Sequence, residues 1–439
     1  MQTVDTIIHA GFIIPVQPLN QVLAKHSLVI NQGKILDILP TQSCNNRYQS
    51  KNTQERLNHA IIPGLINAHT HSPMSLFRGL ADDLSLDDWL NSHIWPAEKQ
   101  WSNPEFIAAG TELAIAEMLR SGTTCFNEHY PFAKTIAETT DKLGMRACIG
   151  GFLIDFPTND ASDAKTYINK AEQLIQQFQS HPLITTAIAP HAPYSVSDDN
   201  FKACFKLADQ YQLPLHIHIH ETEFEVNNSL KEHGVRPLQR LNQLGLINQR
   251  FISVHSVCFD DSDIQLLAEH HAHIVHCPKS NLKLASGFAP IQKSINAGVN
   301  VALGTDSAAS NNSLDLFSEM QTAAILAKAV SQNPTALPAA KALEMATLNG
   351  AKALGIDNIT GSLEINKAAD LAIVHLNDIE SLPLYDPISQ LVYATTKNQV
   401  TDTWVAGKQL LNNRKLLLIN EERLRISAVA WQEKISKGL

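Results

Sequence analysis

The sequence predicts an α/β protein in which a (β/α)8 TIM-like barrel is joined to a small β-sandwich domain formed by both chain termini. Three observations predict this architecture. Compact apolar runs with few charges occur eight times, amphipathic helical segments separate them, and shorter β-type runs flank the series at both ends of the chain.

The eight apolar runs have the composition of strands that are buried on both faces of a sheet. The helical segments between them supply the crossover connections that parallel strands need. An open α/β sheet is the alternative, and the number of runs favours a closed barrel. The runs occupy residues 61–71, 122–130, 146–155, 183–194, 213–221, 251–257, 271–280 and 299–307.

The helical segment before the second run carries clear start and stop signals. Asn103 is suited to an N-cap, Pro104 to the first turn, and Gly122 to the position just beyond the end. We therefore expect a helix between Asn103 and Gly122.

The two chain ends share a pattern of short β-type runs separated by polar turns. We expect residues 1–60 to form the N-terminal part of the β-sandwich and residues 61–365 to form the barrel. Residues 366–439 are expected to supply the C-terminal part of the sandwich and a terminal helix.

Composition excludes several classes of protein. The chain has 439 residues with a formal net charge of −9, which repels a phosphate backbone, so nucleic acid is not an expected partner. The amino terminus has no basic leader, and its apolar stretch is far shorter than the roughly 20 residues of a membrane span. We expect a cytoplasmic protein with no membrane contact. The six cysteines form no CxxC pair and are expected to be buried thiols.

Polar residues gather where the predicted strands end. In a parallel barrel these ends meet at one face, where the active sites of such barrels lie. Histidines and carboxylates end the first, fifth, sixth and eighth runs: His69, His71, His218, Glu221, His255 and Asp306.

Two imidazoles at His69 and His71 lie on the same face of one strand and can reach one ion. The alternative is a pair of hydrogen-bonded structural histidines. The fifth run offers His216, His218 and His220 on one face, and not all three can be ligands. One of them, with the carboxylate of Asp306, would complete a shell of three nitrogens and one oxygen.

Such a shell predicts one divalent metal ion. Zn²⁺ is the default, although Fe²⁺ or Mn²⁺ occupies similar shells. A cation of this kind makes a nucleophilic water available at neutral pH. Asp306 has an alternative as a helix N-cap, and His255 as a buried structural histidine.

Attack on an aromatic carbon that bears an amino group needs two proton transfers. His255 and Asp306 can accept the proton of water, and Glu221 can protonate the ring nitrogen. The predicted catalytic set is therefore Glu221, His255 and Asp306.

Nine motifs, in order along the chain, resemble those of the 5′-methylthioadenosine/S-adenosylhomocysteine deaminases, amidohydrolases grouped with the triazine hydrolases. The likeness covers nearly the whole chain and implies the barrel and sandwich described above. The motifs are PGLINAHTHSPMSLFRGLADDLSLDDWL, WPAEKQW, GTTCFNEHY, APHAPYSVS, HIHETE, VHSV, HCPKSNLKLASG, GTDSAASNNSLDLFSEM and ATLNGAKALG…GSLEINKAADLAIV.

The resemblance implies a metal-dependent hydrolytic deaminase and names residues for it. Its substrate would be 5′-methylthioadenosine, adenosine or S-adenosylhomocysteine, and its products an inosine-type nucleoside and ammonia. Members usually form homo-oligomers. The implied metal ligands are His69, His71, His218 and Asp306. The implied substrate-binding residues are Glu98, His191, Glu221 and Asp306, with Glu98 accepting hydrogen bonds from the ribose; a solvated helix-end carboxylate is the alternative for Glu98.

One departure concerns the loop after the third run. Some relatives carry arginines there that meet the carboxylate of the homocysteine tail, whereas this chain has only Arg146, early in the strand. Phe152, Leu153, Phe156 and Pro157 better suit a methylthio group or plain adenosine, unless another subunit supplies a cation.

Two other functions stay open. The first is a guanine or pterin deaminase, or a triazine-type hydrolase. The second, of another class, is a metal-free relative that acts as a scaffold protein. The presence of a suitable residue at every metal-ligand position argues against it. Trp89 and Trp95 either line the pocket or pack in the core.

Overall fold

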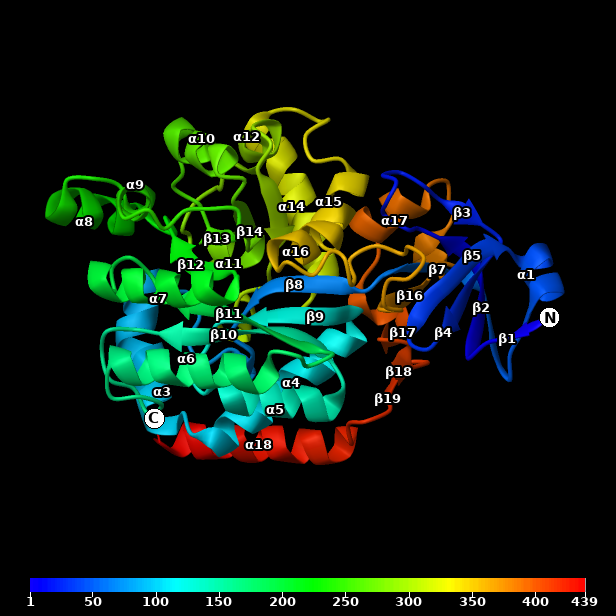
Figure 1. The fold of residues 1–439 in the computed structure, drawn as a ribbon, viewed down its shortest axis with the longest axis horizontal. Coiled ribbons are helices and arrows are strands. Elements are labelled where there is room, and N and C mark those ends of the chain that lie inside the picture. Colours follow the sequence, from blue (N-terminus) through cyan, green and yellow to red (C-terminus); the bar gives the residue numbers. More distant parts are fainter. Residues whose placement is uncertain (439) are drawn as a thin grey trace.

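Eight parallel strands form the predicted barrel (Figure 1). In the computed structural model, which describes residues 1–438, the strands follow one another around the ring in sequence order. Their residues are nearly all buried, which explains the unbroken apolar runs. The barrel strands are β8 (Leu65–Thr70), β9 (Thr123–Glu128), β10 (Arg146–Leu153), β11 (Ile184–Pro190), β12 (Leu215–Ile219), β13 (Phe251–His255), β14 (His273–His276) and β15 (Asn300–Leu303).

Each predicted run contains one of these strands, and the first run needs a correction. Its opening residues, Ile61 to Pro63, end a strand of the second sheet, and the barrel strand begins at Leu65. Gly64 separates the two, and a Cβ there would overlap the side chain of Thr124. One apolar run therefore contributes residues to two sheets, and hydrophobicity alone does not reveal the boundary between the two strands.

The last strand meets the first at the seam of the barrel. The amide of Asp306 donates to His69 O at 3.0 Å. The amide of Thr305 donates to Asn67 Oδ1 at 2.9 Å. Gly304 permits this approach, because a Cβ there would lie 2.8 Å from His69 Cβ. The seam places Asp306 beside His69 of β8 and His71, which directly follows that strand.

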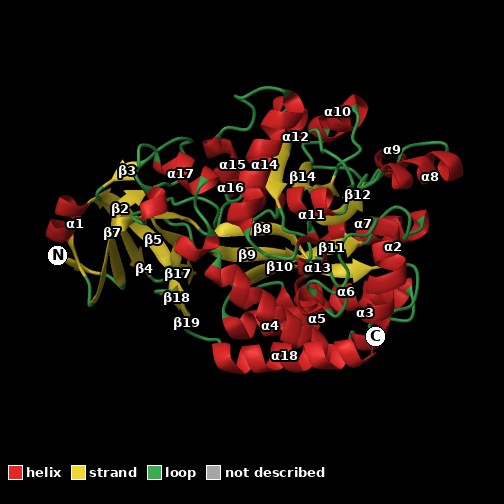
Figure 2. Ribbon diagram, turned by 180° about the vertical axis from the view of Figure 1, so that it is seen from behind, coloured by secondary structure: helices red, strands yellow, loops and turns green. Residues whose placement is uncertain are grey.

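Helices surround the barrel strands (Figure 2). The predicted helix is α4 (Pro104–Arg120), and its signals are confirmed: Asn103 accepts from two amides of the first turn, and Gly122 follows the end with φ +80°. The other helices from the second barrel strand to the end of the barrel region are α5 (Ala133–Leu143), α6 (Ala164–Phe178), α7 (Asp198–Tyr211), α8 (Glu223–His233), α9 (Pro237–Gln243), α10 (Asp261–Glu269), α11 (Pro278–Lys283), α12 (Ile291–Asn296), α13 (Ala308–Asn311), α14 (Leu316–Ser331), α15 (Ala339–Met345) and α16 (Leu348–Ala353).

A second sheet contains strands from both chain ends, as the sequence predicts. The long strand β7 pairs with β2 on one side and with β16 on the other, so it joins the two ends. The order along this sheet is β19 (Lys415–Leu416), β18 (Lys408–Asn412), β17 (Val400–Val405), β16 (Leu371–His375), β7 (Asn52–Pro63), β2 (Thr6–Ile13), β4 (His26–Asn31) and β5 (Lys34–Pro40), with β3 (Leu23–Ala24) beside β2. The domain limits at 60 and 365 stay a prediction.

A buried ion pair joins the barrel to the second sheet. Arg146, at the amino end of β10, donates from Nε to Asp370 Oδ2 at 2.7 Å, and both side chains are almost fully buried. Asp370 also accepts from the Ala406 amide. The guanidinium of Arg146 therefore stabilises the contact between the barrel and the second sheet, at the end of the barrel opposite the site described below.

Two further features concern the chain as a whole. All six cysteines are free thiols, and five of them are buried as expected, whereas Cys258 is partly exposed. No helix within residues 1–438 is long and apolar enough to cross a membrane. The terminal helix α18 (Glu421–Gly438) lies along α4, with the ring of Trp431 against that of Phe106.

Candidate active site

A pocket opens at the carboxyl ends of the barrel strands. Every catalytic, metal-binding or substrate-binding side chain that the sequence predicts either lines this pocket or lies directly beneath it; of the four apolar residues at the end of the third run and after it, Phe152 and Phe156 line it, and Leu153 and Pro157 do not. His69 is the one beneath, because it is fully buried. The predicted residues on the pocket wall are His71, Glu98, His191, His218, Glu221, His255 and Asp306.

Three imidazole nitrogens and one carboxylate oxygen converge at the base of the pocket. His69 Nε2 lies 3.2 Å from His218 Nε2. Asp306 Oδ1 lies 3.4 Å from His69 Nε2 and 3.3 Å from His71 Nε2. Ligand atoms at about 2.0–2.1 Å from a tetrahedral zinc ion are about 3.3–3.4 Å apart. The four side chains therefore fit one such cation.

Neighbouring groups fix the orientation of two of these rings. Nδ1 of His71 donates to the carbonyl of His129 at 2.6 Å, and Nδ1 of His218 donates to that of His191 at 2.8 Å. A carbonyl only accepts, so the proton sits on Nδ1 and Nε2 is free to bind a cation. Burial lowers the pKa of His218 well below its ordinary value, which keeps the ring neutral, as a metal ligand must be.

The carboxylate of Asp306 is held by two serines. Oδ2 accepts hydrogen bonds from Ser280 Oγ at 2.6 Å and from Ser310 Oγ at 2.9 Å, which leaves Oδ1 for the histidines. Asp306 also has φ +61°, a strained conformation that is common at functional sites. The helix that follows is capped by Ser307, so the N-cap alternative for Asp306 is wrong.

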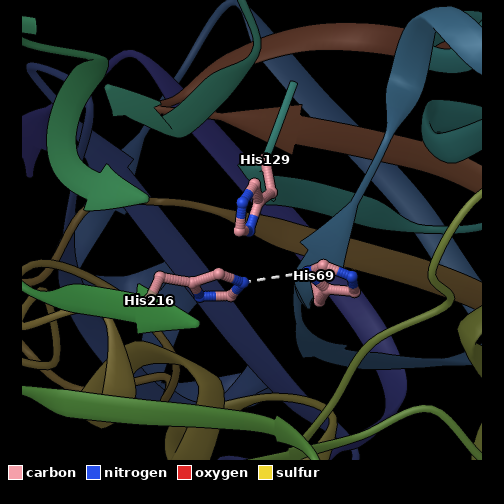
Figure 3. Close-up of side chains that lie close together, drawn as sticks. All are labelled: His69, His129 and His216. Atoms are coloured by element: carbon pink, nitrogen blue, oxygen red, sulfur yellow. Dashed lines mark hydrogen bonds between the residues drawn. The ribbon is translucent and has the colours of Figure 1, made fainter. Parts of the chain in front are cut away.

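His216 and His218 of β12, and His220 just beyond its end, have three different surroundings. His218 joins the convergent group. His216 Nε2 is hydrogen-bonded to Nδ1 of His69 at 2.9 Å, behind that group (Figure 3). His220 Nε2 accepts from the Leu238 amide at 3.0 Å, outside the pocket. The structure thus distinguishes residues that the strand pattern leaves equivalent.

The contact between His216 and His69 leads to a prediction. Replacing His216 with leucine is expected to weaken metal binding about 10–100-fold, because the ring of His69 loses the partner that orients it. Competition with a chelator measures the affinity.

His220→Leu is the matched control, since it removes an imidazole four residues further along the same segment without touching His69. That variant should lose stability and keep its metal affinity. Equal affinity in the two variants would show that His216 has no part in metal binding.

A second group of imidazoles also brings its nitrogens together. His129 joins His69 and His216, with one nitrogen of each within 4.8 Å of the others (Figure 3). All three are fully or almost fully buried, and no carboxylate belongs to the group. A doubly charged cation there would lack a counter-charge, so the group with Asp306 is the better site.

An acid and a base candidate lie beside the convergent group. His255 Nε2 is 3.7 Å from Glu221 Oε2, and His255 Nδ1 donates to Asn281 Oδ1 at 2.8 Å. Burial raises the pKa of Glu221 to about 7. The protonated form of Glu221 is therefore accessible near neutral pH. The carboxylate of Glu225 holds the chain here by accepting from the amides of His220 and Glu221.

Glu98 belongs to the pocket and is not a solvated carboxylate. It lies on α3 (Trp95–Trp101) and accepts a hydrogen bond from Tyr130 Oη at 2.6 Å. Burial raises the pKa of Glu98 to about 6. Trp89 and Trp95 both line the pocket, and Trp89 is in addition buried in the hydrophobic core, so both alternatives hold for that residue.

Sequence reasoning missed Tyr130, and it interpreted His129, near a predicted strand end, as a structural or supporting residue. Both line the pocket, and the ring of His129 stacks on His218 at a centroid distance of 4.5 Å. The available signal was their position at the end of the second predicted run, where the polar side chains of the other runs were found.

A parallel barrel with such a group at its mouth defines a class: hydrolases that depend on a divalent metal. The model of the amidohydrolase family matches residues 60–410. The chain belongs to the amidohydrolase family and, within it, to the 5-methylthioadenosine/S-adenosylhomocysteine deaminases.

Individual relatives are similar over almost their whole length. The 5-methylthioadenosine/S-adenosylhomocysteine deaminase of Saccharophagus degradans is 45% identical over 431 residues, 98% of this chain and 97% of that protein. The protein of the same name from Teredinibacter turnerae is 44% identical over 433 residues, 99% and 98%. The crystal structure of an adenosine deaminase from Xanthomonas campestris with bound zinc has a TM-score of 0.98 and 49% identity, and covers 99% of both chains.

Proposed function

We propose that this protein hydrolyses the 6-amino group of an adenine nucleoside, releasing ammonia and leaving an inosine-type nucleoside. The observation that carries the proposal is the convergence of His69, His71, His218 and Asp306 beside Glu221. The names of its relatives, which include deaminases of methylthioadenosine and adenosine, support the choice of substrate.

The four convergent side chains would hold one divalent cation, with zinc the first choice for three imidazoles and a carboxylate. When bound, the cation supplies a water that can attack at neutral pH. Asp306 contributes the negative charge of the shell. Its Oδ2 is already held by two serines, so only Oδ1 is directed at the cation.

Glu221 and His255 divide the proton transfers: the first proton of water passes through the base to the amino group, which leaves as ammonia, and the proton of the new hydroxyl restores Glu221 as the carbonyl forms. Glu221 donates a proton to the ring nitrogen next to the attacked carbon, which its raised pKa permits near neutral pH. His255 and Asp306 accept the proton of the attacking water. The hydrogen bond from His255 Nδ1 to Asn281 leaves Nε2 facing the pocket as the acceptor.

Glu98 and His191 hold the nucleoside. Glu98 is oriented by Tyr130 and accepts from the ribose hydroxyls, while His191, whose Nδ1 is hydrogen-bonded to Ser195 Oγ at 2.7 Å, contacts the substrate with its other nitrogen. Because the contact of Glu98 needs a sugar, the free base guanine and triazines would leave this carboxylate unpaired.

A substrate panel tests the function. The purified protein with its metal is assayed for ammonia release from adenosine, methylthioadenosine, guanine and melamine. We expect turnover of the nucleosides and at most traces with the other two. Turnover of guanine or melamine without the nucleosides would replace this function by one of its alternatives, and a protein without bound metal would favour a scaffold role.

Two further expectations stay predictions. Association into a homo-oligomer is implied by resemblance, and light scattering on the purified protein tests it. A cytoplasmic location rests on the sequence alone.

A further inference from the structure

One wall of the pocket faces the reacting groups from across the barrel. It consists of α3 and the loop of residues 154–163, which follows β10. In the ring of eight strands, β10 lies opposite β14, whose neighbours β13 and β15 lead to His255 and Asp306. A nucleoside with its amino group at those residues therefore directs its other end, the 5′ substituent, toward this wall.

The surface of this wall is apolar. Trp95 lies one helical turn before Glu98 on α3, so the two share a face. Its ring packs edge-on against Phe156, with the centroids 5.6 Å apart. Phe152 and Ile154 continue the wall along β10 and the start of the loop. Beside Glu98, which is proposed to bind the ribose, the pocket wall therefore consists of aromatic and aliphatic side chains.

No permanent positive charge reaches the pocket. Among the residues that line it, all within the described range 1–438, there is no lysine or arginine. The loop itself carries three aspartates and no lysine or arginine. Arg146 of the preceding strand is bound to Asp370 at the far end of the barrel. An anionic substituent would find no counter-charge here.

The polar groups of the loop are already engaged. The amide of Asn159 donates to Lys99 O and to Ser102 O, both at 2.9 Å. The three carboxylates of the loop also have partners. Asp155 accepts a hydrogen bond from the Ser197 amide, Asp160 forms an ion pair with Lys170, and Asp163 caps the amino end of α6. The loop therefore offers no charged donor for a carboxylate and no free carboxylate for an ammonium group.

We propose that the pocket selects adenine nucleosides with a small or apolar 5′ substituent, such as methylthio or hydrogen, and rejects the zwitterionic homocysteine tail. This inference rests on the proposed deaminase function and narrows its substrate. The physical cause is desolvation: both charges of the tail would lose water at the Trp95–Phe156 wall without gaining a partner. Trp95 and Phe156 are the specificity residues.

The test compares kcat/KM for methylthioadenosine, 5′-deoxyadenosine and S-adenosylhomocysteine. We expect both nucleosides without a charged tail to exceed S-adenosylhomocysteine by at least about 100-fold, in line with the discrimination that unpaired polar groups produce. Similar values for all three would overturn the inference while leaving the deaminase function intact. Failure to deaminate any of them would instead overturn the function.

A gain of activity tests the wall itself. Phe156 is 38% exposed, so an arginine can be placed there without disturbing the core. Phe156→Arg should raise kcat/KM for S-adenosylhomocysteine about 10-fold relative to methylthioadenosine, because the tail gains a charged hydrogen-bond donor. Phe156→Leu, the matched control, should give no such gain. Equal ratios in the two variants would show that charge at this wall does not set specificity.

Discussion

Glu221→Gln is expected to lower kcat about 10²–10⁴-fold while leaving the metal in place. Glutamine has nearly the same shape, so the pocket keeps its form, but it cannot donate a proton to the purine ring. Glu221 is not one of the four convergent side chains, and its pKa of about 7 suits a group that must be protonated near neutral pH. Steady-state kinetics and metal analysis of the same preparation measure both effects.

Glu223→Gln is the control for this substitution. Glu223 lies two residues further on, exposed on α8, and the same change there should leave kcat unchanged. Normal turnover in Glu221→Gln would remove Glu221 from the mechanism. A loss of metal in that variant would contradict the geometry, because Glu221 would then support the cation.

Asp306→Ala is expected to abolish both metal binding and activity. Asp306 supplies the only carboxylate of the convergent group, so its loss leaves three neutral imidazoles to hold a doubly charged ion. We expect the metal content to fall from about one equivalent to nearly none after dialysis, and kcat to fall more than about 10³-fold because a proton acceptor is lost as well.

The nearby Asp315 provides the comparison. It accepts hydrogen bonds from two amides at the start of α14, so Asp315→Asn should affect stability alone. If Asp306→Ala retained a full equivalent of metal after dialysis, Asp306 would not be a ligand.

The sequence predicts the barrel and the position of the site well, because both depend on local patterns. Strands buried on two faces must be apolar throughout, and parallel strands must end at one face, so His69, His71 and Asp306 can be placed together before any coordinates are known. The boundary at Gly64 could not be predicted, because β7 and β8 form a single apolar run.

Contacts across the barrel were beyond sequence reasoning. His216, His218 and His220 alternate along one apolar run and look alike in the sequence, and only their neighbours from other parts of the fold distinguish them. Ser280 on α11 and Ser310 on α13 likewise reach Asp306 only through the folding of two separate helices. Resemblance to a family selected His218, and the geometry supplies the physical reason for that choice.

The central claim is that one cation lies between His69, His71, His218 and Asp306. Anomalous diffraction at the zinc edge, from crystals of the metal-loaded protein, tests it most directly. The account predicts a single peak about 2.0–2.2 Å from Nε2 of each of the three histidines and from Oδ1 of Asp306. A peak among His69, His129 and His216, or a peak out of reach of Asp306, would contradict it.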